Sequence, residues 1–261
     1  MEKINMNNNT VILADYRSGS QYLVNAMANT IIDCKIPHYA TESTEILNVN
    51  VSEEVVPKAT RFQYFRNNFN RPPIDKNEML RHAVNITELY LQNYNLFKIF
   101  KEEVIKEDMA INNNYCDWLI NETNNGRINC INLIRKNTLH RFVSLKVAEK
   151  SGIWHTNIKR STPTVIHVDV NNLLEFINHS SNVNDKIQQL FKNSYTLYYE
   201  DLIRDPKTSI INLAKWYNMY IGVFENPYTK PTNPFKMTDV ISNYTEVCKK
   251  LHDTEYAWML D

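Results

Sequence analysis

The chain has little glycine, little cysteine and no net charge. Its 261 residues include only four glycines and four cysteines, and 29 basic side chains balance 29 acidic ones. The cysteines are scattered and form no C-x-x-C pair, which argues against a zinc site or a disulfide framework and favours a reducing compartment. Without excess positive charge, a general attraction to nucleic acid or anionic membranes has no support. Any anion site must therefore be local.

Long apolar runs are also absent. No stretch approaches the ~18 apolar residues of a membrane span, and the polar residues 6–10 leave the N-terminal region without the apolar core of a signal peptide. We therefore expect no membrane span and a cytoplasmic location. No low-complexity linker or internal repeat divides the chain, and a hydrophobic content of 43% suffices for one core. We expect a single domain over residues 1–261.

Short apolar runs alternate with segments of helical periodicity. Strands are predicted at residues 11–14, 96–100, 128–134, 164–168 and 195–199. Helices are predicted after the first of these strands, over residues 77–93, over residues 139–148, and after Asp205 and Pro206, which form an N-cap and first-turn pair. Alternating strands and helices indicate an α/β fold with a parallel sheet.

The segment from Asp15 to Tyr22 has the composition of an anion-binding loop. A buried strand leads into it, and a helix follows, whose free backbone N–H groups and dipole favour negative charge. Gly19 lets the backbone approach a phosphate closely. The Arg17 guanidinium and the Ser18 hydroxyl add donors suited to phosphate or sulfate oxygens. On these residues alone, an ordinary turn with a solvated arginine is an equal alternative.

A second anion site is indicated where the strand over residues 128–134 ends. Arg135 and Lys136 follow this strand directly, and Ser144 lies nine positions after Arg135 on the next predicted helix. Open α/β sheets bind their ligands at the carboxyl ends of the strands. This edge of the sheet is therefore the expected ligand site.

These two segments together resemble the cofactor motifs of sulfotransferases that use 3′-phosphoadenosine 5′-phosphosulfate (PAPS). The sequence RSGS at residues 17–20 resembles the family's 5′-phosphosulfate loop, and Arg135 with Ser144 resembles its 3′-phosphate motif. The sequence SGIWH at residues 151–155 is similar to a segment of the bacterial nodulation-type and trehalose-type carbohydrate sulfotransferases, and YYEDL at residues 198–202 resembles the family's Tyr-Glu-Asp-Leu segment. The resemblance spans residues 11–258.

The resemblance implies a three-layer, P-loop-like α/β fold with a central parallel sheet flanked by helices. It implies PAPS as the sulfuryl donor, a carbohydrate or glycolipid hydroxyl as the acceptor, and a homodimer. The chemistry needs no metal, because arginine and lysine neutralise the phosphosulfate. The resemblance assigns cofactor binding to the following residues: Arg17, Ser18, Gly19, Ser20, Gln21, Tyr22, Arg135, Ser144 and Tyr199. Tyr199 is the candidate for adenine packing.

The resemblance also implies a catalytic base and cations that face the leaving oxygen. Glu45 is the first candidate for the base, with Glu42 and His38 as alternatives that the variable length of this region leaves open. Lys98, on the predicted strand over residues 96–100, and Arg17 are the candidate cations. An outward-facing, solvated Lys98 is the alternative.

Other polar and aromatic residues near these motifs are assigned no part in the site. Arg141 and Lys146 flank Ser144 on its predicted helix, and we expect both to be solvated. Trp154 is expected in the core, and His155 is a secondary candidate for the acceptor pocket.

Two alternatives to a sulfotransferase stay open. A catalytically inactive nucleotide-binding module would keep the fold and lack the base. A divergent P-loop kinase is disfavoured, because the Gly-x4-Gly-Lys-Ser/Thr spacing is missing and no lysine follows Gly19 in the loop.

Overall fold

The computed structural model describes residues 9–36, 60–69, 78, 81–105, 113–154, 162–227 and 235–260. In these parts, four parallel strands form one sheet: β1 (Thr10–Ala14), β2 (Leu96–Phe100), β3 (Asn129–Ile134) and β4 (Tyr195–Tyr198). The strand order is β2-β1-β3-β4, so β1 lies between two neighbours, with Ile12 opposite Lys98 on one side and Ile131 on the other. The expected α/β class with a parallel central sheet is confirmed.

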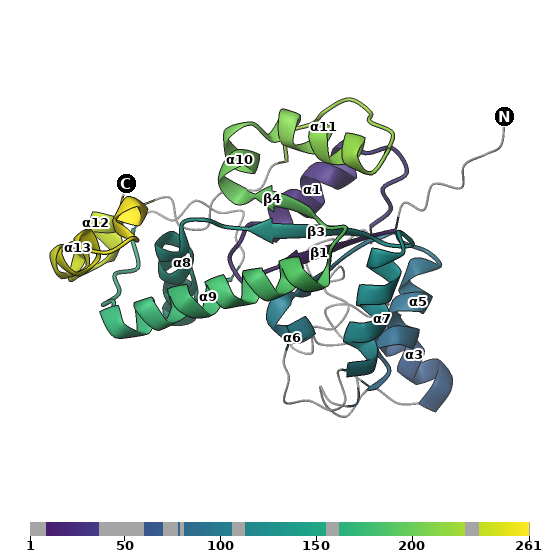
Figure 1. The fold of residues 1–261 in the computed structure, drawn as a ribbon, viewed down its shortest axis with the longest axis horizontal. Helices are drawn as coiled ribbons and strands as arrows, with labels where there is room; N and C mark the ends of the chain where they lie inside the picture. Colours follow the sequence, from purple (N-terminus) through teal and green to yellow (C-terminus); the bar gives the residue numbers. More distant parts are fainter. Residues whose placement is uncertain are drawn as a thin grey trace.

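Helices cover both faces of the sheet, which makes three layers (Figure 1). One face carries α1 (Ser20–Thr30), α10 (Tyr199–Arg204) and α11 (Pro206–Trp216). The other face carries α5 (Ala83–Leu91), α6 (Lys101–Ile105), α7 (Asn113–Asn124) and the long α9 (Val170–Leu190), with α3 (Thr60–Phe69) packed on α5.

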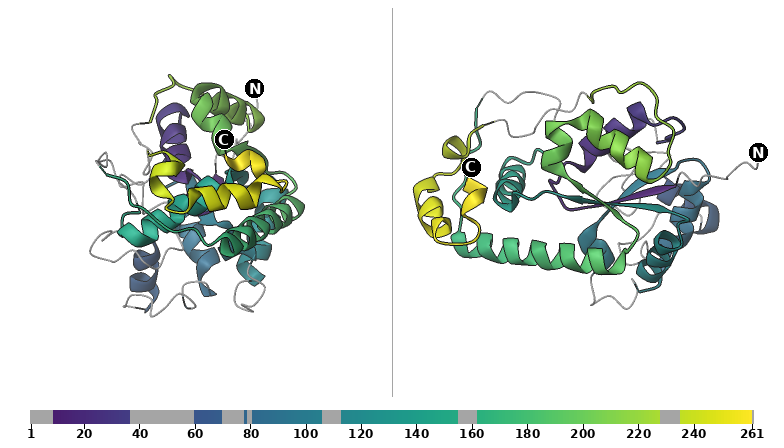
Figure 2. Two further views of the ribbon diagram at one scale, coloured as in Figure 1. Left: turned by 90° about the vertical axis from the view of Figure 1, so that its left-hand side faces the viewer. Right: turned by 45° about the horizontal axis from the view of Figure 1, so that its top comes forward.

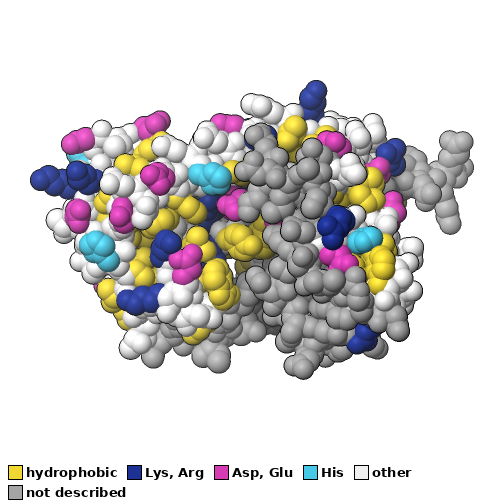
Figure 3. Space-filling model, turned by 90° about the horizontal axis from the view of Figure 1, so that it is seen from below, with side chains coloured by type: hydrophobic (Ala, Val, Ile, Leu, Met, Phe, Trp, Pro, Cys, Tyr) yellow, Lys and Arg dark blue, Asp and Glu magenta, His cyan; other side chains and the backbone are white. Residues whose placement is uncertain are grey.

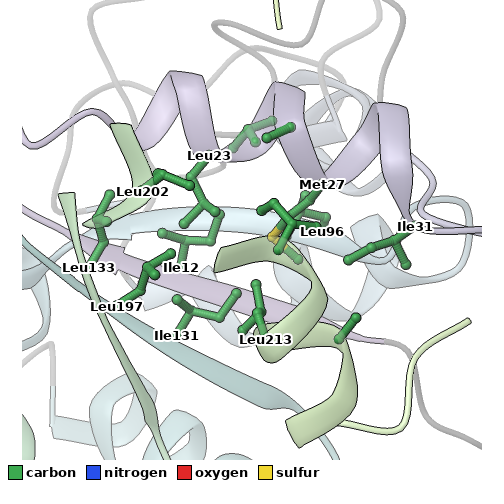
Figure 4. Close-up of a cluster of buried hydrophobic side chains, with 14 of the residues drawn as sticks. Ile12, Leu23, Met27, Ile31, Leu96, Ile131, Leu133, Leu197, Leu202 and Leu213 are labelled. Carbon is green, nitrogen blue, oxygen red and sulfur yellow. The ribbon is translucent and has the colours of Figure 1, made fainter. Parts of the chain in front are cut away.

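Alternation along β1 explains why both faces are covered. Val11 and Leu13 belong to the cluster that packs against α5 and α7, whereas Ile12 and Ala14 belong to the cluster beneath α1, α10 and α11. Successive side chains of a strand point to opposite faces, so a strand buried on both faces reads as a continuous apolar run. Figure 4 shows the second cluster, in which Leu23 and Met27 of α1 lie over Ile12.

A third apolar cluster lies beyond the carboxyl ends of the strands. It joins α8 (Thr138–Ser151) and α9 to α12 (Met237–Val240), α13 (Tyr244–His252) and the short 3₁₀ helix η1 (Ala257–Leu260). In Figures 1 and 2 these C-terminal helices lie beside α8 at one end of the molecule. Here the prediction of a strand at residues 164–168 is wrong. Ile166 makes only an isolated bridge to Ile241, and it is apolar because it packs among these helices.

The other predicted elements agree with the structure to within a few residues. The strands at residues 96–100, 128–134 and 195–199 are confirmed as β2, β3 and β4. Asp205 caps α11 by accepting a hydrogen bond from the Thr208 N–H at 3.1 Å, and Pro206 follows it as predicted. Glu78 and Arg81 of the helix predicted over residues 77–93 are helical, His82 interrupts it with a turn, and α5 follows from Ala83.

The strand order creates a switch point between β1 and β3. The chain leaves β1 for β2 on one side and returns for β3 on the other side of β1. Two loops therefore diverge at the carboxyl ends of β1 and β3, where open α/β sheets bind ligands. Both predicted anion-binding segments begin at this place.

On the face that Figure 3 shows, the described Lys and Arg side chains lie among Asp and Glu side chains, and among these described residues neither sign gathers into one large patch. In the described parts of the chain, no helix has the length and apolar character to cross a membrane.

Tyr217, at the end of α11, joins the beginnings of β3 and β4. Its hydroxyl oxygen accepts hydrogen bonds from the backbone N–H groups of Tyr195 at 3.0 Å and Cys130 at 3.2 Å, and its O–H donates to the carbonyl of Cys130. One side chain thus satisfies three backbone groups at the start of the two strands.

We expect Tyr217→Phe to lower the free energy of unfolding by about 1–3 kcal/mol, because partly buried backbone groups would lose their partner. Urea denaturation measures the change. Tyr220→Phe, at an exposed tyrosine, is the matched control and should stay within about 0.5 kcal/mol of the wild type. Equal effects of the two substitutions would show that Tyr217 contributes only its ring.

Candidate functional site

The loop after β1 has an unusual backbone conformation, and hydrogen bonds between Ser18 and Asp15 close it. The N–H of Ser18 donates to the carbonyl of Asp15 at 3.2 Å, and the Ser18 hydroxyl donates to the same oxygen at 2.7 Å. Arg17 has φ 64° and Gly19 has φ 86°, so both lie in the left-handed region. A non-glycine residue in this region is strained by about 1–3 kcal/mol and needs support from its surroundings. The Ser18 side chain therefore shapes the loop.

Gly19 is required here for space as well as for its backbone angle. A Cβ atom at this position would lie 2.4 Å from two carbons of the Tyr199 ring. Tyr199 is the first residue of α10, directly after β4. The tyrosine predicted to pack near the adenine therefore lies against the predicted phosphosulfate loop.

Arg135, which follows β3, connects the two loops. Its Nη1 donates to the carbonyl of Arg17 at 3.0 Å, and its guanidinium lies 4.7 Å from the centre of the Tyr199 ring. Its Nε is buried and has no hydrogen-bond partner among the described residues. Burial lowers the pKa of Arg135, and Tyr199 and Glu200 oppose this effect. A cation with an unused donor thus lies at the carboxyl edge of the sheet.

Glu200 holds the loop that Arg135 begins. Its two carboxylate oxygens accept hydrogen bonds from the backbone N–H groups of Lys136 at 3.1 Å and Asn137 at 3.0 Å. Asn137 in turn caps α8, because its side chain accepts from the His140 N–H at 2.9 Å. Glu200, the neighbour of Tyr199, is therefore fixed to the start of α8.

Arg17 bridges the loop after β1 to α8. Its Nε donates to the Ser144 Oγ at 3.0 Å, and its Nη1 donates to the carbonyl of Trp154. The structure therefore brings together five of the predicted cofactor residues, from four separate segments: Arg17, Gly19, Arg135, Ser144 and Tyr199. These contacts join the two predicted anion-binding segments in one site.

Apart from Ser18, which lies in the loop, the remaining predicted cofactor residues form the first turn of α1. Ser20 is buried, the Gln21 amide donates to the Asn25 side chain at 3.1 Å, and the Tyr22 hydroxyl donates to the Asn226 side chain at 2.9 Å. The Gln21 amide nitrogen and the Tyr22 hydroxyl thus have partners elsewhere. Their backbone N–H groups are the part of these residues suited to an anion at the helix start.

Lys98 is buried on the face of the sheet that α1 covers. Lys98 pairs with Ile12 in the register of β2 and β1. Its side chain is 2% exposed, so the solvated alternative is wrong. Its Nζ lies 6.0 Å from the centre of the Phe100 ring, and Phe100 stacks on Tyr16 of the loop at 3.8 Å. Lys98 therefore lies near the loop end of its strand.

The candidates for the catalytic base fall outside the described residues. This holds for Glu45, Glu42 and His38, and also for His155. Their roles stay predictions. In the parts of the chain that the structure describes, no three His, Cys, Asp or Glu side chains gather as metal ligands would.

A buried cluster of charges beneath the loop corrects the expectation for Arg141. Arg141 is 4% exposed and its Nη1 lies 2.7 Å from the Oδ2 of Asp15, which is itself 7% exposed. Lys101, with a fully buried side chain, lies 3.4 Å from the same oxygen. Lys101 also donates to the Leu133 carbonyl at 2.9 Å and to the Asn184 side chain at 2.6 Å. Every N–H of its ammonium therefore has an acceptor.

The sequence contains a signal for Arg141 that the prediction did not use. Arg141 lies three residues before Ser144, a spacing that places both on one face of a helix. Lys146 is exposed and pairs with Glu149 at 2.9 Å, in agreement with a solvated role. Trp154 is 41% exposed, so the expected core packing is wrong, and its carbonyl is the part that meets the site.

No family model and no curated protein matches the chain. Two solved structures are similar to it. One, a sulfotransferase domain from the curacin biosynthetic pathway, is 16% identical with a TM-score of 0.39, over 85% of this chain and 80% of that domain. The other, a sulfotransferase domain from the Synechococcus PCC 7002 olefin synthase, is 16% identical with a TM-score of 0.42, over 97% of this chain and 86% of that domain. Likenesses this distant assign no activity or ligand to the chain.

We expect Gly19→Ala to destabilise the protein more than Gly126→Ala. Both glycines have positive φ, but a Cβ at Gly126 would meet nothing within 4 Å, whereas one at Gly19 would strike Tyr199. The backbone strain of an alanine at positive φ, about 1–2 kcal/mol, is thus common to both variants, and the clash belongs to Gly19 alone. Thermal unfolding of the two variants measures the difference. Adding Tyr199→Leu to Gly19→Ala should recover part of the loss, and equal losses in the two single variants would refute the contact.

We expect the difference in the free energy of unfolding between the wild type and Lys101→Met to depend on pH. Burial lowers the pKa of Lys101 to about 8, partly offset by Asp15. Unfolded Lys101 stays protonated well above this pH, so the unfolded state binds more protons, and the Lys101 contribution to the free energy of unfolding rises with pH. Between about pH 7 and about pH 8.5, the free energy of unfolding of the wild type should rise by about 1 kcal/mol relative to that of Lys101→Met. Urea denaturation of both proteins measures this gain.

Burial raises the pKa of Cys130 more than the charge of Lys101 lowers it, so this neighbouring thiol stays protonated in both folded proteins over this pH range. A difference that stays constant over this pH range would show that Lys101 keeps an ordinary pKa.

Proposed function

We propose that the chain is a sulfotransferase that moves a sulfuryl group from PAPS to an acceptor hydroxyl. The observation that carries this proposal is the contact between the two anion-binding segments, in which Arg17 Nε donates to Ser144 Oγ at 3.0 Å beside Arg135. Each segment alone suits one anion. Together they suit a ligand with two anionic groups on one nucleoside, as in PAPS.

The residues present fit such a donor. Arg135 has a buried Nε with no partner among the described residues, and an arginine with an unused donor suits a phosphate. Because Gly19 has no Cβ atom, the loop backbone can lie against the Tyr199 ring. We assign the 5′-phosphosulfate to the loop at residues 17–20, the 3′-phosphate to Arg135 and Ser144, and the adenine to the neighbourhood of Tyr199.

When bound, PAPS supplies a sulfur that an acceptor oxygen attacks in line as the bond to the bridging oxygen breaks and adenosine 3′,5′-bisphosphate leaves. Arg17 and Lys98 would stabilise the charge that develops on the bridging oxygen. A base would take the hydroxyl proton, with Glu45 as first candidate and Glu42 and His38 as alternatives. We propose a carbohydrate or glycolipid hydroxyl as the acceptor.

A calorimetric titration tests the donor site. We expect wild-type protein to bind adenosine 3′,5′-bisphosphate more tightly than adenosine 5′-monophosphate, because only the first carries the 3′-phosphate. Arg135→Ala should weaken binding of the bisphosphate about 10- to 100-fold, through loss of a charge-assisted contact, and change binding of the monophosphate far less.

Lys136→Ala is the matched control, since this neighbouring cation lies over the Tyr198 ring instead, 3.8 Å from its centre. Binding of both ligands should survive this change. Correctly folded wild-type protein that fails to bind the bisphosphate would refute the proposed function. Binding without transfer from PAPS to any hydroxyl acceptor would favour an inactive module.

A further inference from the structure

Asp15 links the anion-binding loop to the helix that carries Ser144. Its main-chain carbonyl accepts both hydrogen bonds from Ser18 that close the loop. Its carboxylate lies 2.7 Å from the Arg141 guanidinium on α8. One residue therefore closes the turn with its backbone and joins it to α8 with its side chain.

The loop is attached to α8 at two points. Arg17 donates to Ser144, and Asp15 pairs with Arg141, which lies three residues before Ser144 on the same helix. Movement of Asp15 relative to α8 would therefore move the Arg17 guanidinium relative to Ser144. The geometry of the two anion-binding segments depends on both attachments.

Arg141 is itself held firmly. Its Nη2 donates to the Ser180 hydroxyl on α9, and its guanidinium lies 4.5 Å from the centre of the Phe176 ring. Both contacts fix the plane of the guanidinium, and a fixed guanidinium directs the carboxylate that it binds. Arg141 thus links Asp15 to α9.

Lys101 belongs to the same cluster but has other principal partners. It is 3.4 Å from the Asp15 carboxylate, whereas it donates to Asn184 at 2.6 Å and to the Leu133 carbonyl at 2.9 Å. It therefore ties α6 to α9 and β3 more than it orients the loop. A change at Lys101 disturbs the same buried cluster and leaves the shorter pair of Asp15 and Arg141 in place.

We propose that Asp15 and Arg141 are positioning residues, which hold the loop at residues 17–19 in the conformation that binds the 5′-phosphosulfate end of the donor. This inference rests on the proposed function. The loop needs outside support, because Arg17, which is not a glycine, has positive φ. The ion pair, whose side chains are both buried, supplies that support from beneath the loop.

The test measures how much the 5′-phosphate contributes to binding. The dissociation constants of adenosine 3′-monophosphate and adenosine 3′,5′-bisphosphate are measured by calorimetry, and their ratio gives this contribution. In Arg141→Met we expect the ratio to fall about tenfold, the effect of losing one good contact to a charged group. Arg141→Lys keeps the charge, and it should restore part of the ratio. Asp15→Asn should lower the ratio as Arg141→Met does.

Lys101→Met is the control for a general loss of packing, and its ratio should equal that of the wild type. An unchanged ratio in both Arg141 variants would overturn the inference, and so would an equal fall in Lys101→Met. If Arg141→Met does not fold, the ratio in Arg141→Lys is compared with the ratio in Lys101→Met instead. Wild-type protein that binds neither nucleotide would refute the proposed function instead, so the two failures are distinguishable.

Discussion

The burial of one carboxylate shapes the functional edge of this protein. β1 lies between two other strands and is covered on both faces, so the residue that follows it, Asp15, leaves the sheet inside the molecule. A buried charge is costly unless it is paired and hydrogen-bonded. Arg141 of α8 meets this need at 2.7 Å and so joins α8 to the loop, whereas Lys101 of α6 lies farther from the same oxygen, at 3.4 Å. The arrangement of the site follows from how this charge is satisfied.

Most of the sheet was predictable from the sequence because its strands are short apolar runs between polar loops. The error at residues 164–168 has a simple cause. Buried residues in an extended segment have the same composition whether they pair with a strand or pack against helices, and Ile166 packs among α8, α9 and α13. Nothing local in a sequence separates these two cases, because the difference lies in partners distant along the chain.

The site was predictable where its residues act through motifs, and less so where they act through burial. Arg17, Gly19, Arg135 and Ser144 come together as their motifs indicated. Arg141 was expected in solvent, because a lone arginine on a helix is usually solvated, and its partner lies in another segment. Glu200 received no role, since its carboxylate accepts from backbone N–H groups, which have no sequence signature. The base candidates stay predictions.

The contact between Gly19 and Tyr199 also concerns the order in which the protein is assembled. The loop comes from the first strand and its neighbour from the start of α10, after the last strand of the sheet. During synthesis, the space in front of Gly19 stays open until β4 has emerged and docked on β3. The contact between the RSGS loop and Tyr199 is therefore completed among the later events of folding. An incomplete chain would contain the RSGS motif without the surroundings that make it a site.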